Sequence, residues 1–378
     1  MSYYEKVVRI YGNAIEEIDP KNTASFEKPS VCGYFSIDSD RKYVSDMSNL
    51  MYYYPRFKES ENHRLELDLN VGMKNVVRKP EELNEKLDHM LYFLLTNANK
   101  LINTDNPNKL LNTDFVCFRG LLTQIMCSLH LREDWTICAT KWKDTIYLCA
   151  ADSKQTYNIP KDEQNKFCSW GYKFEQYMLT KKPEVPPDTS KPVHESEEFC
   201  CVFKSKLNSH SLIYGAEMDG ILSNKEINES DPNWDTIEFI ELKTSKKVIR
   251  INQDRTLKMF KFIKWWAQSY LVNVKQVHCG FRDRNGIVTE ILPFNVKDLP
   301  RLSGNCWNWR SCLNFCDIFL KIVKDTIPEN TDDPHIVWKF EWKQNLQHFK
   351  IDEVKGENTY SFLPKWYIDN MKNVVNNL

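Results

Sequence analysis

The stretch of chain between residues 217 and 243 constrains the fold more than any other, because a similar charged triplet stands at each of its ends. Each triplet places two charged side chains around one apolar side chain. The two triplets are Glu217-Met218-Asp219 and Glu241-Leu242-Lys243. In a β-strand, residues i and i+2 lie on the same face, about 7 Å apart. We therefore expect two strands that pair, with the charged residues on one face and the central apolar residues in a core.

Paired strands would bring three carboxylates and one ammonium group together on a small patch. Clustered carboxylates repel one another unless a cation lies between them, and oxygen ligands favour Mg²⁺ or Mn²⁺ over zinc. A lysine beside such an ion suits phosphate hydrolysis, because it can hold a phosphate oxygen or polarise a water. Two half-exposed strands whose charges face solvent would give the same pattern. The triplets alone therefore leave both interpretations open.

Two further segments carry side chains suited to such a site. Glu175, on a predicted helix over residues 161–179, is either a solvated acid or a fourth carboxylate delivered from outside the sheet. The window from Lys243 to Lys264 contains eight basic residues and one acid, Asp254, in a chain of net charge −1. A charge run is usually solvated surface, but a run that begins at the proposed metal patch also fits phosphate binding.

Gln268 and Arg119 are further candidates for binding phosphate or sugar groups. Gln268 shares a predicted helix face with Lys261 and either bonds such a group or only caps a polar surface. Arg119, in Phe118-Arg119-Gly120 at the start of a predicted helix, is poorly placed for the helix dipole, so we expect an anionic partner. No P-loop, G-x-S-x-G or H-E-x-x-H motif is present.

Composition favours a soluble intracellular protein with a large core. Hydrophobic residues make up 42% of the 378 residues, which disfavours disorder. The 12 cysteines include no C-x-x-C pair, so a zinc ribbon is not expected and buried reduced thiols are. We find no secretory signal and no apolar run of about 18 residues, so we expect no membrane association.

Hydrophobic periodicity predicts helices, then mixed strands, then helices, an order typical of an α+β fold. Residues 1–30 are expected to form an N-terminal arm or short strand, and residues 31–378 a single domain with a proline-rich loop at 181–196. Helices are predicted at 80–101, 119–131, 161–179, 258–271, 313–322 and 363–375. Strands are predicted at 135–140, 144–149, 199–207, 212–222, 236–243, 274–282, 287–292 and 336–342.

Together, these segments resemble the DXO family of decapping exoribonucleases, which includes partner proteins of the nuclear 5′–3′ exoribonuclease. The resemblance covers residues 30 to 370 and follows five motifs in their family order. The motifs are Gly171-Tyr172-Lys173-Phe174-Glu175-Gln176-Tyr177-Met178, Glu217-Met218-Asp219, Glu241-Leu242-Lys243-Thr244-Ser245, Lys264-Trp265-Trp266-Ala267-Gln268-Ser269 and Gly280-Phe281-Arg282. The resemblance implies two β-sheets, one larger and mixed, packed together with flanking helices around a metal-dependent nuclease core of the Asp…Glu-x-Lys type.

The resemblance also implies roles for individual residues. The implied ligands of two Mg²⁺ ions, or of Mn²⁺, are Glu175, Glu217, Asp219, Glu241 and the main-chain carbonyl of Leu242. The implied catalytic residues are Glu175, Glu217, Asp219, Glu241 and Lys243. The implied substrate contacts are Arg41, Glu85, Phe118, Arg119, Gly120, Cys200, Glu217, Lys243 and Gln268. Phe118 stands where the family more commonly has tryptophan, so we expect a different stacking surface there.

The implied function is a metal-dependent hydrolase of RNA 5′ ends in 5′-end quality control. Expected products are a cap dinucleotide from unmethylated caps, pyrophosphate from triphosphate ends, NAD from NAD-capped RNA, and mononucleotides from 5′–3′ digestion. Two alternatives stay open: a non-catalytic partner that stabilises a nuclear 5′–3′ exoribonuclease, and a DNA nuclease with the same metal core. The chain keeps every acid, which disfavours the non-catalytic partner. A nuclear location follows from the resemblance, and a cytoplasmic one stays open.

Overall fold

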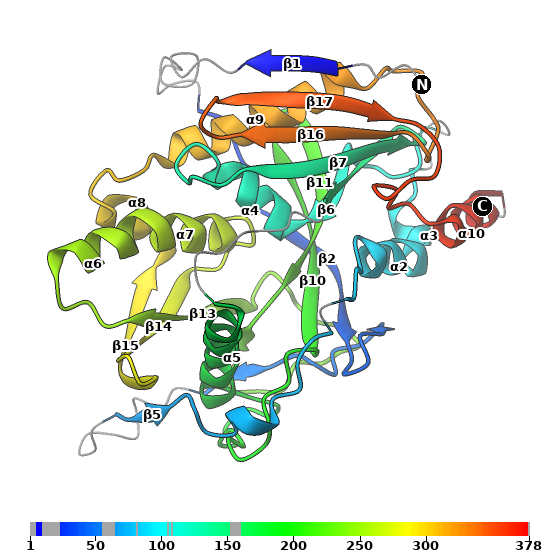
Figure 1. Cartoon of the computed structure of the whole chain (residues 1–378). Helices are drawn as coiled ribbons and strands as arrows, with labels where there is room; N and C mark the ends of the chain where they lie inside the picture. Colours follow the sequence, from blue (N-terminus) through cyan, green and yellow to red (C-terminus); the bar gives the residue numbers. More distant parts are fainter. Residues whose placement is uncertain are drawn as a thin grey trace.

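The computed structural model describes residues 5–9, 23–54, 65–80, 82–103, 106, 109–151 and 160–376, which form two mixed β-sheets and several helices (Figure 1). In these residues the larger sheet has ten strands, in the spatial order β1 (Glu5–Arg9), β17 (His348–Val354), β16 (Val337–Lys343), β7 (Trp135–Trp142), β8 (Thr145–Ala150), β6 (Phe115–Phe118), β11 (His210–Glu217), β10 (Glu198–Leu207), β2 (Ser30–Ile37) and β3 (Tyr43–Val44). The smaller sheet has seven, in the order β5 (Leu67–Asp68), β15 (Ile287–Asn295), β14 (Gln276–Arg282), β13 (Glu238–Lys246), β12 (Gly220–Leu222), β4 (Tyr52–Tyr53) and β9 (Leu179–Thr180).

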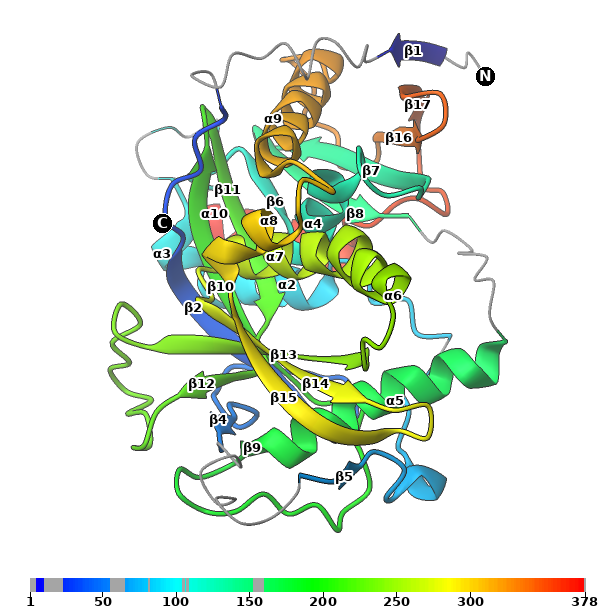
Figure 2. The same ribbon diagram turned by 90° about the vertical axis from the view of Figure 1, so that its left-hand side faces the viewer.

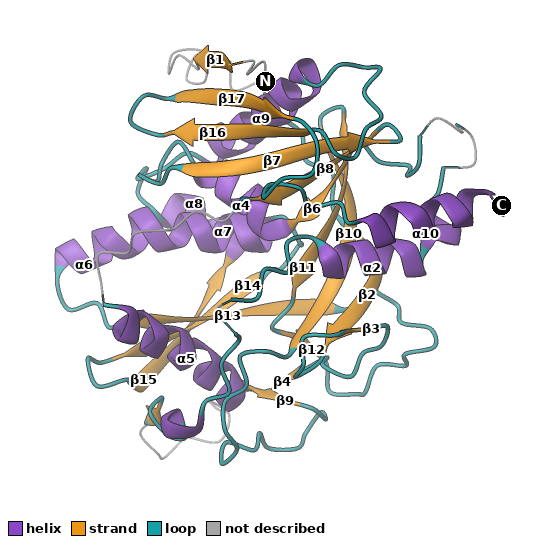
Figure 3. Ribbon diagram, turned by 45° about the vertical axis from the view of Figure 1, so that its right-hand side comes forward, coloured by secondary structure: helices purple, strands orange, loops and turns teal. Residues whose placement is uncertain are grey.

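The helices pack between the sheets and on their outer faces (Figures 2 and 3). They are α2 (Asp88–Thr96), α3 (Ala98–Leu101), α4 (Arg119–Cys127), α5 (Lys161–Met178), α6 (Ile251–Thr256), α7 (Phe262–Tyr270), α8 (Leu299–Leu302), α9 (Trp309–Thr326) and α10 (Lys365–Asn376). In the largest hydrophobic cluster, α4 packs against β6 and β11, and α7 packs against β14. Helices α2 and α10 cover the other face of the larger sheet, and α5 covers the smaller sheet. The predicted arrangement of two sheets with flanking helices is therefore confirmed.

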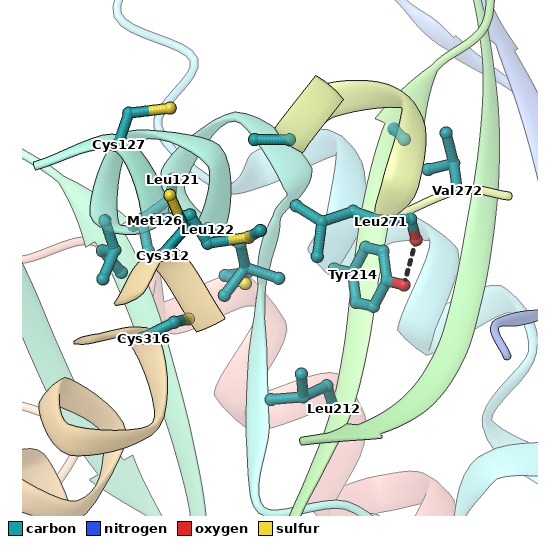
Figure 4. Packing of buried hydrophobic residues seen from close by; sticks show 14 of the residues in the cluster. Leu121, Leu122, Met126, Cys127, Leu212, Tyr214, Leu271, Val272, Cys312 and Cys316 are labelled. Carbon is teal, nitrogen blue, oxygen red and sulfur yellow. Dashed lines mark hydrogen bonds between the residues drawn. The ribbon is translucent and has the colours of Figure 1, made fainter. Parts of the chain in front are cut away.

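Strand β11 illustrates why the larger sheet is covered on both faces. Leu212 and Tyr214 belong to the cluster between the sheets, whereas Ile213 belongs to the cluster under α2 and α10. This alternation follows from the period of two along a strand. The Tyr214 hydroxyl donates a hydrogen bond to the backbone oxygen of Leu271, just after α7 (Figure 4). The bond satisfies a buried polar group and ties the larger sheet to the helix that packs on the smaller one.

The prediction of one continuous strand over residues 212–222 is wrong. Strand β11 ends at Glu217 in the larger sheet, and β12 begins at Gly220 in the smaller sheet. The start of β12 is tightly packed, because a Cβ atom on Gly220 would lie 2.7 Å from the Leu179 side chain and would require that side chain to shift. The chain thus changes sheets within the first charged triplet, and this crossing positions the site described below.

Several other boundaries also differ from the sequence prediction, among them the predicted helix over 313–322, which is Trp309–Thr326 in the structure. The helix expected over 80–101 begins only at Asp88, because Lys86 has a φ of 43° that a right-handed helix does not accommodate. Strand β7 runs on to Trp142, and a two-residue turn with positive φ at Lys143 and Asp144 closes the hairpin. The helix expected from residue 258 begins at Ile251 and passes through a π-helical turn into α7.

In the described residues, the N-terminal segment contributes a strand and most of the cysteines are buried. Within the predicted N-terminal arm, Glu5–Arg9 pairs antiparallel with β17 as the outermost strand of the larger sheet. The cysteines are all free, and most are buried, as expected for structural thiols. In the part of the chain that the structure describes, no helix is long and apolar enough to cross a membrane.

Candidate active site

The candidate active site lies where the chain leaves the larger sheet and enters the smaller one. Glu217 is the last residue of β11, and Asp219 immediately precedes β12. Strand β12 pairs with only the first part of β13, because Gly220 lies opposite Ile240. Asp219 therefore lies beside the segment of β13 that continues beyond β12, and its Oδ2 atom accepts a hydrogen bond of 2.6 Å from the Leu242 amide.

Glu241 and Lys243 share one face of β13, as their spacing predicts. The Nζ atom of Lys243 donates a hydrogen bond to Oε1 of Glu241. The other carboxylate oxygen, Oε2, lies 3.5 Å from Nη1 of Arg119, which is too far for a well-formed hydrogen bond. Both of these atoms are buried and have no hydrogen-bond partner in the described residues. The Glu241 carboxylate thus lies between two cations and keeps one unsatisfied oxygen.

Glu175 approaches the same place from α5, which packs on β13. Its neighbour Phe174 is fully buried against Gly280 of β14, where a Cβ atom would lie 2.6 Å from the phenylalanine ring. The missing side chain of Gly280 therefore lets the helix lie close to the sheet. The charges of the other three acids all act on the carboxyl group of Glu175. The structure thus brings together the four carboxylates that the sequence singled out.

Burial and mutual repulsion disfavour the ionised form of three of these acids. Burial, followed by the charges of Asp219 and Glu217, raises the pKa of Glu175 well above its ordinary value. Burial and the charge of Glu241 raise the pKa of Asp219 to about 7. Burial and neighbouring carboxylates also raise the pKa of Glu217, although this side chain keeps exposed surface. Ionisation of all four acids therefore requires additional positive charge, which a bound cation supplies.

Glu241 is the acid of the group that stays ionised most readily. Burial alone would raise its pKa, but the charges of Lys243 and Arg119 lower it overall. The pKa of Lys243 is raised in turn, because the charges of Glu241 and Asp219 outweigh the effect of burial. At neutral pH the centre of the site is thus an ionised Glu241 with a protonated lysine beside it.

The donor atoms of the site fit a divalent cation. All of the side-chain donors are carboxylate oxygens, which Mg²⁺ and Mn²⁺ prefer. The unsatisfied Oε2 atom of Glu241 offers one ligand position. As the side chains stand, no three acidic, histidine or cysteine residues in the described ranges are close enough together to hold an ion.

Arg41 is the centre of a second charged cluster beside these acids. Its guanidinium group pairs with Glu85 and with Glu198, each at 2.6 Å, and Lys79 lies 2.7 Å from Glu85. Burial alone would raise the pKa of Glu85, but hydrogen bonds from Arg41 and Lys79 lower it to about 2. Two predicted substrate contacts, Arg41 and Glu85, are therefore bonded to each other. The charge of Glu198 acts on Glu217, so the cluster adjoins the acids.

Cys200 lies directly opposite Glu217 on the neighbouring strand β10. It is buried, and burial together with the charges of Glu198 and Glu217 raises the pKa of its thiol. Its neighbour Cys201 belongs instead to the core between the sheets. Of the two adjacent cysteines, the structure therefore places Cys200 on the side of the charged clusters.

The Phe118-Arg119-Gly120 turn joins β6 to α4, as predicted. Phe118 is half-buried and packs beside Gly215, where a Cβ atom would lie 3.0 Å from its ring. Arg119, the first residue of α4, is buried, and its anionic partner within the protein is Glu241. Gly120 is exposed, and a Cβ atom there would meet nothing within 4 Å. Packing within the protein therefore does not explain a glycine at this position.

Gln268 is the predicted site residue with the weakest connection to the acids. It is half-buried on α7, and no hydrogen bond of its side chain occurs among the described residues. Two of the basic residues near it have acidic partners, because Lys258 pairs with Asp254 at 2.6 Å and Lys264 pairs with Glu133 at 2.9 Å. The excess positive charge that the sequence shows in this window is therefore partly neutralised in the fold.

Sequence reasoning missed three residues near the site, namely Glu198, Tyr172 and Lys79. Tyr172 precedes Glu175 by one helical turn, and burial with the charges of Glu217 and Glu175 raises the pKa of its hydroxyl. The sequence signal for Tyr172 is its position within the first family motif, Gly171 to Met178. Glu198 is one of several acids before a predicted strand, and only the register of β10 directs it toward the arginine cluster.

Comparison with known proteins gives relatives that span nearly the whole chain. A family model described as RAI1-like PD-(D/E)XK nuclease matches residues 27–368. The decapping and exoribonuclease protein of Homo sapiens is 32% identical over 358 residues, which cover 92% of this chain and 86% of that protein. The decapping and exoribonuclease protein Rai1 of Drosophila melanogaster is also 32% identical, and the match covers 92% of each chain.

Solved structures share the two-sheet fold. Candida albicans Rai1, determined in complex with pU5-Mn²⁺, has a TM-score of 0.79 at 19% identity, with 93% of this chain and 97% of that chain covered. Scheffersomyces stipitis Rai1, determined with (3′-NADP)⁺ and calcium ion, has a TM-score of 0.77 at 20% identity, with 93% and 98% covered. The nuclease fold expected from the sequence is thus confirmed. On its sequence and its fold, the chain belongs to the family of RAI1-like PD-(D/E)XK nucleases.

Proposed function

We propose that this protein is a divalent-metal-dependent hydrolase that acts at RNA 5′ ends. The observation that carries the proposal is the crossing between the sheets, where Glu175, Glu217, Asp219 and Glu241 meet beside Lys243. Carboxylates crowded together with a lysine suit the hydrolysis of a phosphodiester or pyrophosphate bond. Membership of the family supports the same chemistry, since its named relatives are decapping proteins and exoribonucleases.

The proposed metal ligands are the four carboxylates and the main-chain carbonyl of Leu242, which together hold two Mg²⁺ ions or Mn²⁺ in their place. When bound, the metal supplies Lewis-acid chemistry at the scissile phosphate. Lys243 binds a non-bridging phosphate oxygen and stabilises the negative charge that develops there. To do so, its ammonium group exchanges part of its bond with Glu241 for one with the substrate. Gln268 bonds the adjacent nucleotide.

The 5′ group of the RNA occupies the space around the second charged cluster. Arg41, Glu85 and Cys200 line it on one side, and the Phe118-Arg119-Gly120 turn lines it on the other. Support comes from the position of Glu198, which bonds the Arg41 guanidinium and acts electrostatically on the acids. Because Gly120 is exposed and its Cβ position is open, a ligand can approach the backbone at the mouth of α4.

The proposed activities differ only in the group that stands at the 5′ end. They are decapping of unmethylated and NAD-capped RNA, release of pyrophosphate from triphosphate RNA, and 5′–3′ exonuclease activity. Related structures with pU5, (3′-NADP)⁺ and 3′-FADP support one site that accepts both RNA and cap-like nucleotides. We place this activity in 5′-end quality control.

The test uses RNAs labelled within the chain that carry triphosphate, unmethylated cap, methylated cap, NAD or monophosphate ends, and a DNA strand of the same sequence. Each is incubated with Mg²⁺, Mn²⁺ or EDTA and with the wild type or E241Q, and E357Q serves as a matched control at an exposed acid. We expect metal-dependent hydrolysis of the RNAs by the wild type and E357Q and at least about a hundredfold loss in E241Q.

Hydrolysis that persists in EDTA or in E241Q contradicts the metal mechanism. Absence of hydrolysis on every end by a folded wild type favours the non-catalytic partner instead. Faster hydrolysis of the DNA strand than of the RNAs favours the DNA nuclease, because the choice between them depends on contacts to the 2′-hydroxyl.

A further inference from the structure

A groove lies between the first half of α5 and the end of the β14–β15 hairpin. We call it the α5–β14 groove; it has a volume of about 460 Å³ and is lined in part by Phe167, Trp170, Lys246, Arg282 and Arg284. The Gly280-Phe281-Arg282 motif contributes Arg282 to this groove, and neither the metal chemistry nor the 5′ pocket uses that arginine.

Arg282 is a buried cation that forms no ion pair in the described residues, although the charge of the adjacent Asp283 acts on it. Only 7% of the residue is exposed. Its guanidinium carbon lies 4.3 Å from the centre of the Trp170 ring and 4.9 Å from that of Phe167. One Nη atom donates a bond of 3.2 Å to the backbone oxygen of Asp283, and Nε has no hydrogen-bond partner among the described residues.

Keeping such a charge buried is unfavourable unless something compensates it. Burial lowers the pKa of Arg282, which reflects the same cost. The two aromatic faces offset part of it, since each such contact contributes about 0.5–2 kcal/mol. A buried charge is normally also paired and hydrogen-bonded. The structure thus presents a guanidinium that an anion from outside the protein would satisfy.

The groove and the candidate active site lie on opposite faces of β13 and meet near Lys246, the last residue of that strand, which lies an odd number of residues from Lys243. Lys246 is the cross-strand partner of Arg282, three residues along β13 from Lys243. Lys261 lies on the same face as Lys243, where its Nζ atom donates bonds of 3.1 Å to the Thr244 oxygen and to the Ser245 hydroxyl. Burial lowers the pKa of Lys261, and the positive charges of Arg282, Lys246 and Lys243 add to this effect.

Helix α5 gives the distance between the two places. Phe167 precedes Glu175 by eight residues on the same helix, which corresponds to about 12 Å along its axis. A single strand whose scissile phosphate lies at the acids therefore reaches the groove within a short length. The Arg41 cluster adjoins the acids on the side of Glu217. The groove lies on the other side of the acids, beyond Lys243. The groove consequently lies on the side of the RNA that is 3′ to its bound end.

We propose that the α5–β14 groove is a binding subsite for a backbone phosphate of the RNA strand, downstream of the scissile bond, with Arg282 and Lys246 as the binding residues. The inference rests on the proposed function and extends it to substrate length. Arg282 supplies a planar fork of donors for a phosphate, and the more exposed Lys246 adds a mobile charge. The lining contains four basic residues and two exposed acids, Asp162 and Glu163, so a net positive charge remains.

The alternative for Arg282 is a purely structural contact that fastens α5 to the hairpin. The two roles predict different kinetics. A structural role would lower the rate for every substrate, because α5 also carries Glu175. A phosphate subsite would act only on strands long enough to reach it. The length dependence of hydrolysis therefore separates the two.

The experiment compares 5′-monophosphorylated oligouridylates of two and ten nucleotides with the wild type, R282Q, R282K and K246Q. The control is K355Q, which removes an exposed charge far from the site, beyond β17. The quantity measured is the ratio of kcat/KM for the decamer to that for the dinucleotide, at several salt concentrations, with thermal unfolding to verify folding. Because Lys246 is exposed, K246Q tests the groove even if R282Q does not fold.

We expect R282Q and K246Q each to lower this ratio about fivefold to tenfold, R282K to restore part of it, and K355Q to leave it unchanged. For the decamer, the dependence of log KM on log salt concentration should weaken by about 0.7 for each lost phosphate contact. An unchanged ratio in both folded groove variants, or an equal loss on both substrates, overturns the proposal.

If the wild type hydrolyses neither substrate, the proposed function fails, and binding decides the subsite separately. Fluorescence anisotropy of a labelled decamer in EDTA then compares the same variants. Weaker binding by R282Q and K246Q than by K355Q supports the groove, and equal binding overturns it. Inorganic phosphate is added as a competitor to show whether the groove recognises a phosphate group. We expect it to displace the decamer only at the high concentrations typical of a single phosphate contact.

Discussion

Asp219 accepts a hydrogen bond of 2.6 Å from the backbone amide of Leu242, and this bond joins the crossing between the sheets to the strand that carries Glu241 and Lys243. It gives Asp219 a structural role in addition to its place among the acids. The same carboxylate suffers from repulsion by Glu241, which raises its pKa to about 7. The charge and the hydrogen-bonding capacity of this side chain therefore have opposite effects on stability.

Substitutions at Asp219 should separate these two effects. D219N keeps an acceptor for the Leu242 amide and removes the repulsion, so in EDTA we expect its stability to equal or exceed that of the wild type. D219A leaves the amide without its partner and should be less stable than D219N by about 1–3 kcal/mol. Urea unfolding in EDTA measures both. A less stable D219N than D219A would show that the bond does not stabilise the fold.

Glu241 and Lys243 should behave as a coupled pair. K243M leaves the buried carboxylate with only the looser contact to Arg119, so we expect it to destabilise the protein. Adding E241Q removes the charge that lost its partner and should restore part of that stability. A double-mutant cycle by chemical denaturation should give a coupling energy of about 0.5–3 kcal/mol. Additive effects would mean that the two side chains contribute independently.

The lowered pKa of Glu85 predicts how the Arg41 cluster responds to acid. A carboxyl group with a lower pKa in the folded protein stabilises it above the unfolded value of 4.5, and this contribution disappears as pH falls toward about 2. The difference in unfolding free energy between the wild type and E85Q should therefore be largest at pH 5–7 and shrink below pH 4.5. Denaturation at a series of pH values measures it, and a constant difference would contradict the assignment.

Two glycines with positive φ allow a matched test of the packing around the α5–β14 groove. Gly286 has a φ of 89°, and a Cβ atom there would lie 2.6 Å from the Trp170 ring, whereas Gly356 has a φ of 76° with nothing near its Cβ position. G356A should cost about 1–2 kcal/mol from backbone strain alone. G286A should cost about 1–3 kcal/mol more, because it also displaces the tryptophan that stacks on Arg282. Urea unfolding of both variants checks the difference.

The sequence alone singled out the four acids that the structure brings together, but not their geometry. The two triplets suggested one pair of strands with a common face. Strands β12 and β13, which adjoin the first triplet and contain the second, do pair with each other. The structure instead divides Glu217 and Asp219 between two sheets. Periodicity could not reveal the division, because each half of the segment alternates correctly on its own strand. At the crossing, Gly220 packs closely against Leu179, which comes from a distant part of the chain.

Local elements and the family pattern were therefore determined by the sequence itself. Helix α5, the β14–β15 hairpin and the order of the charged motifs follow from spacing, turn residues and the burial of apolar side chains. Tertiary structure alone decided that Arg119 approaches Glu241, that Arg41 bonds both Glu85 and Glu198, and that Arg282 is buried without an ion pair in the described residues. These relationships join residues that are far apart in the chain, so their existence depends on strand order and register rather than on any local preference.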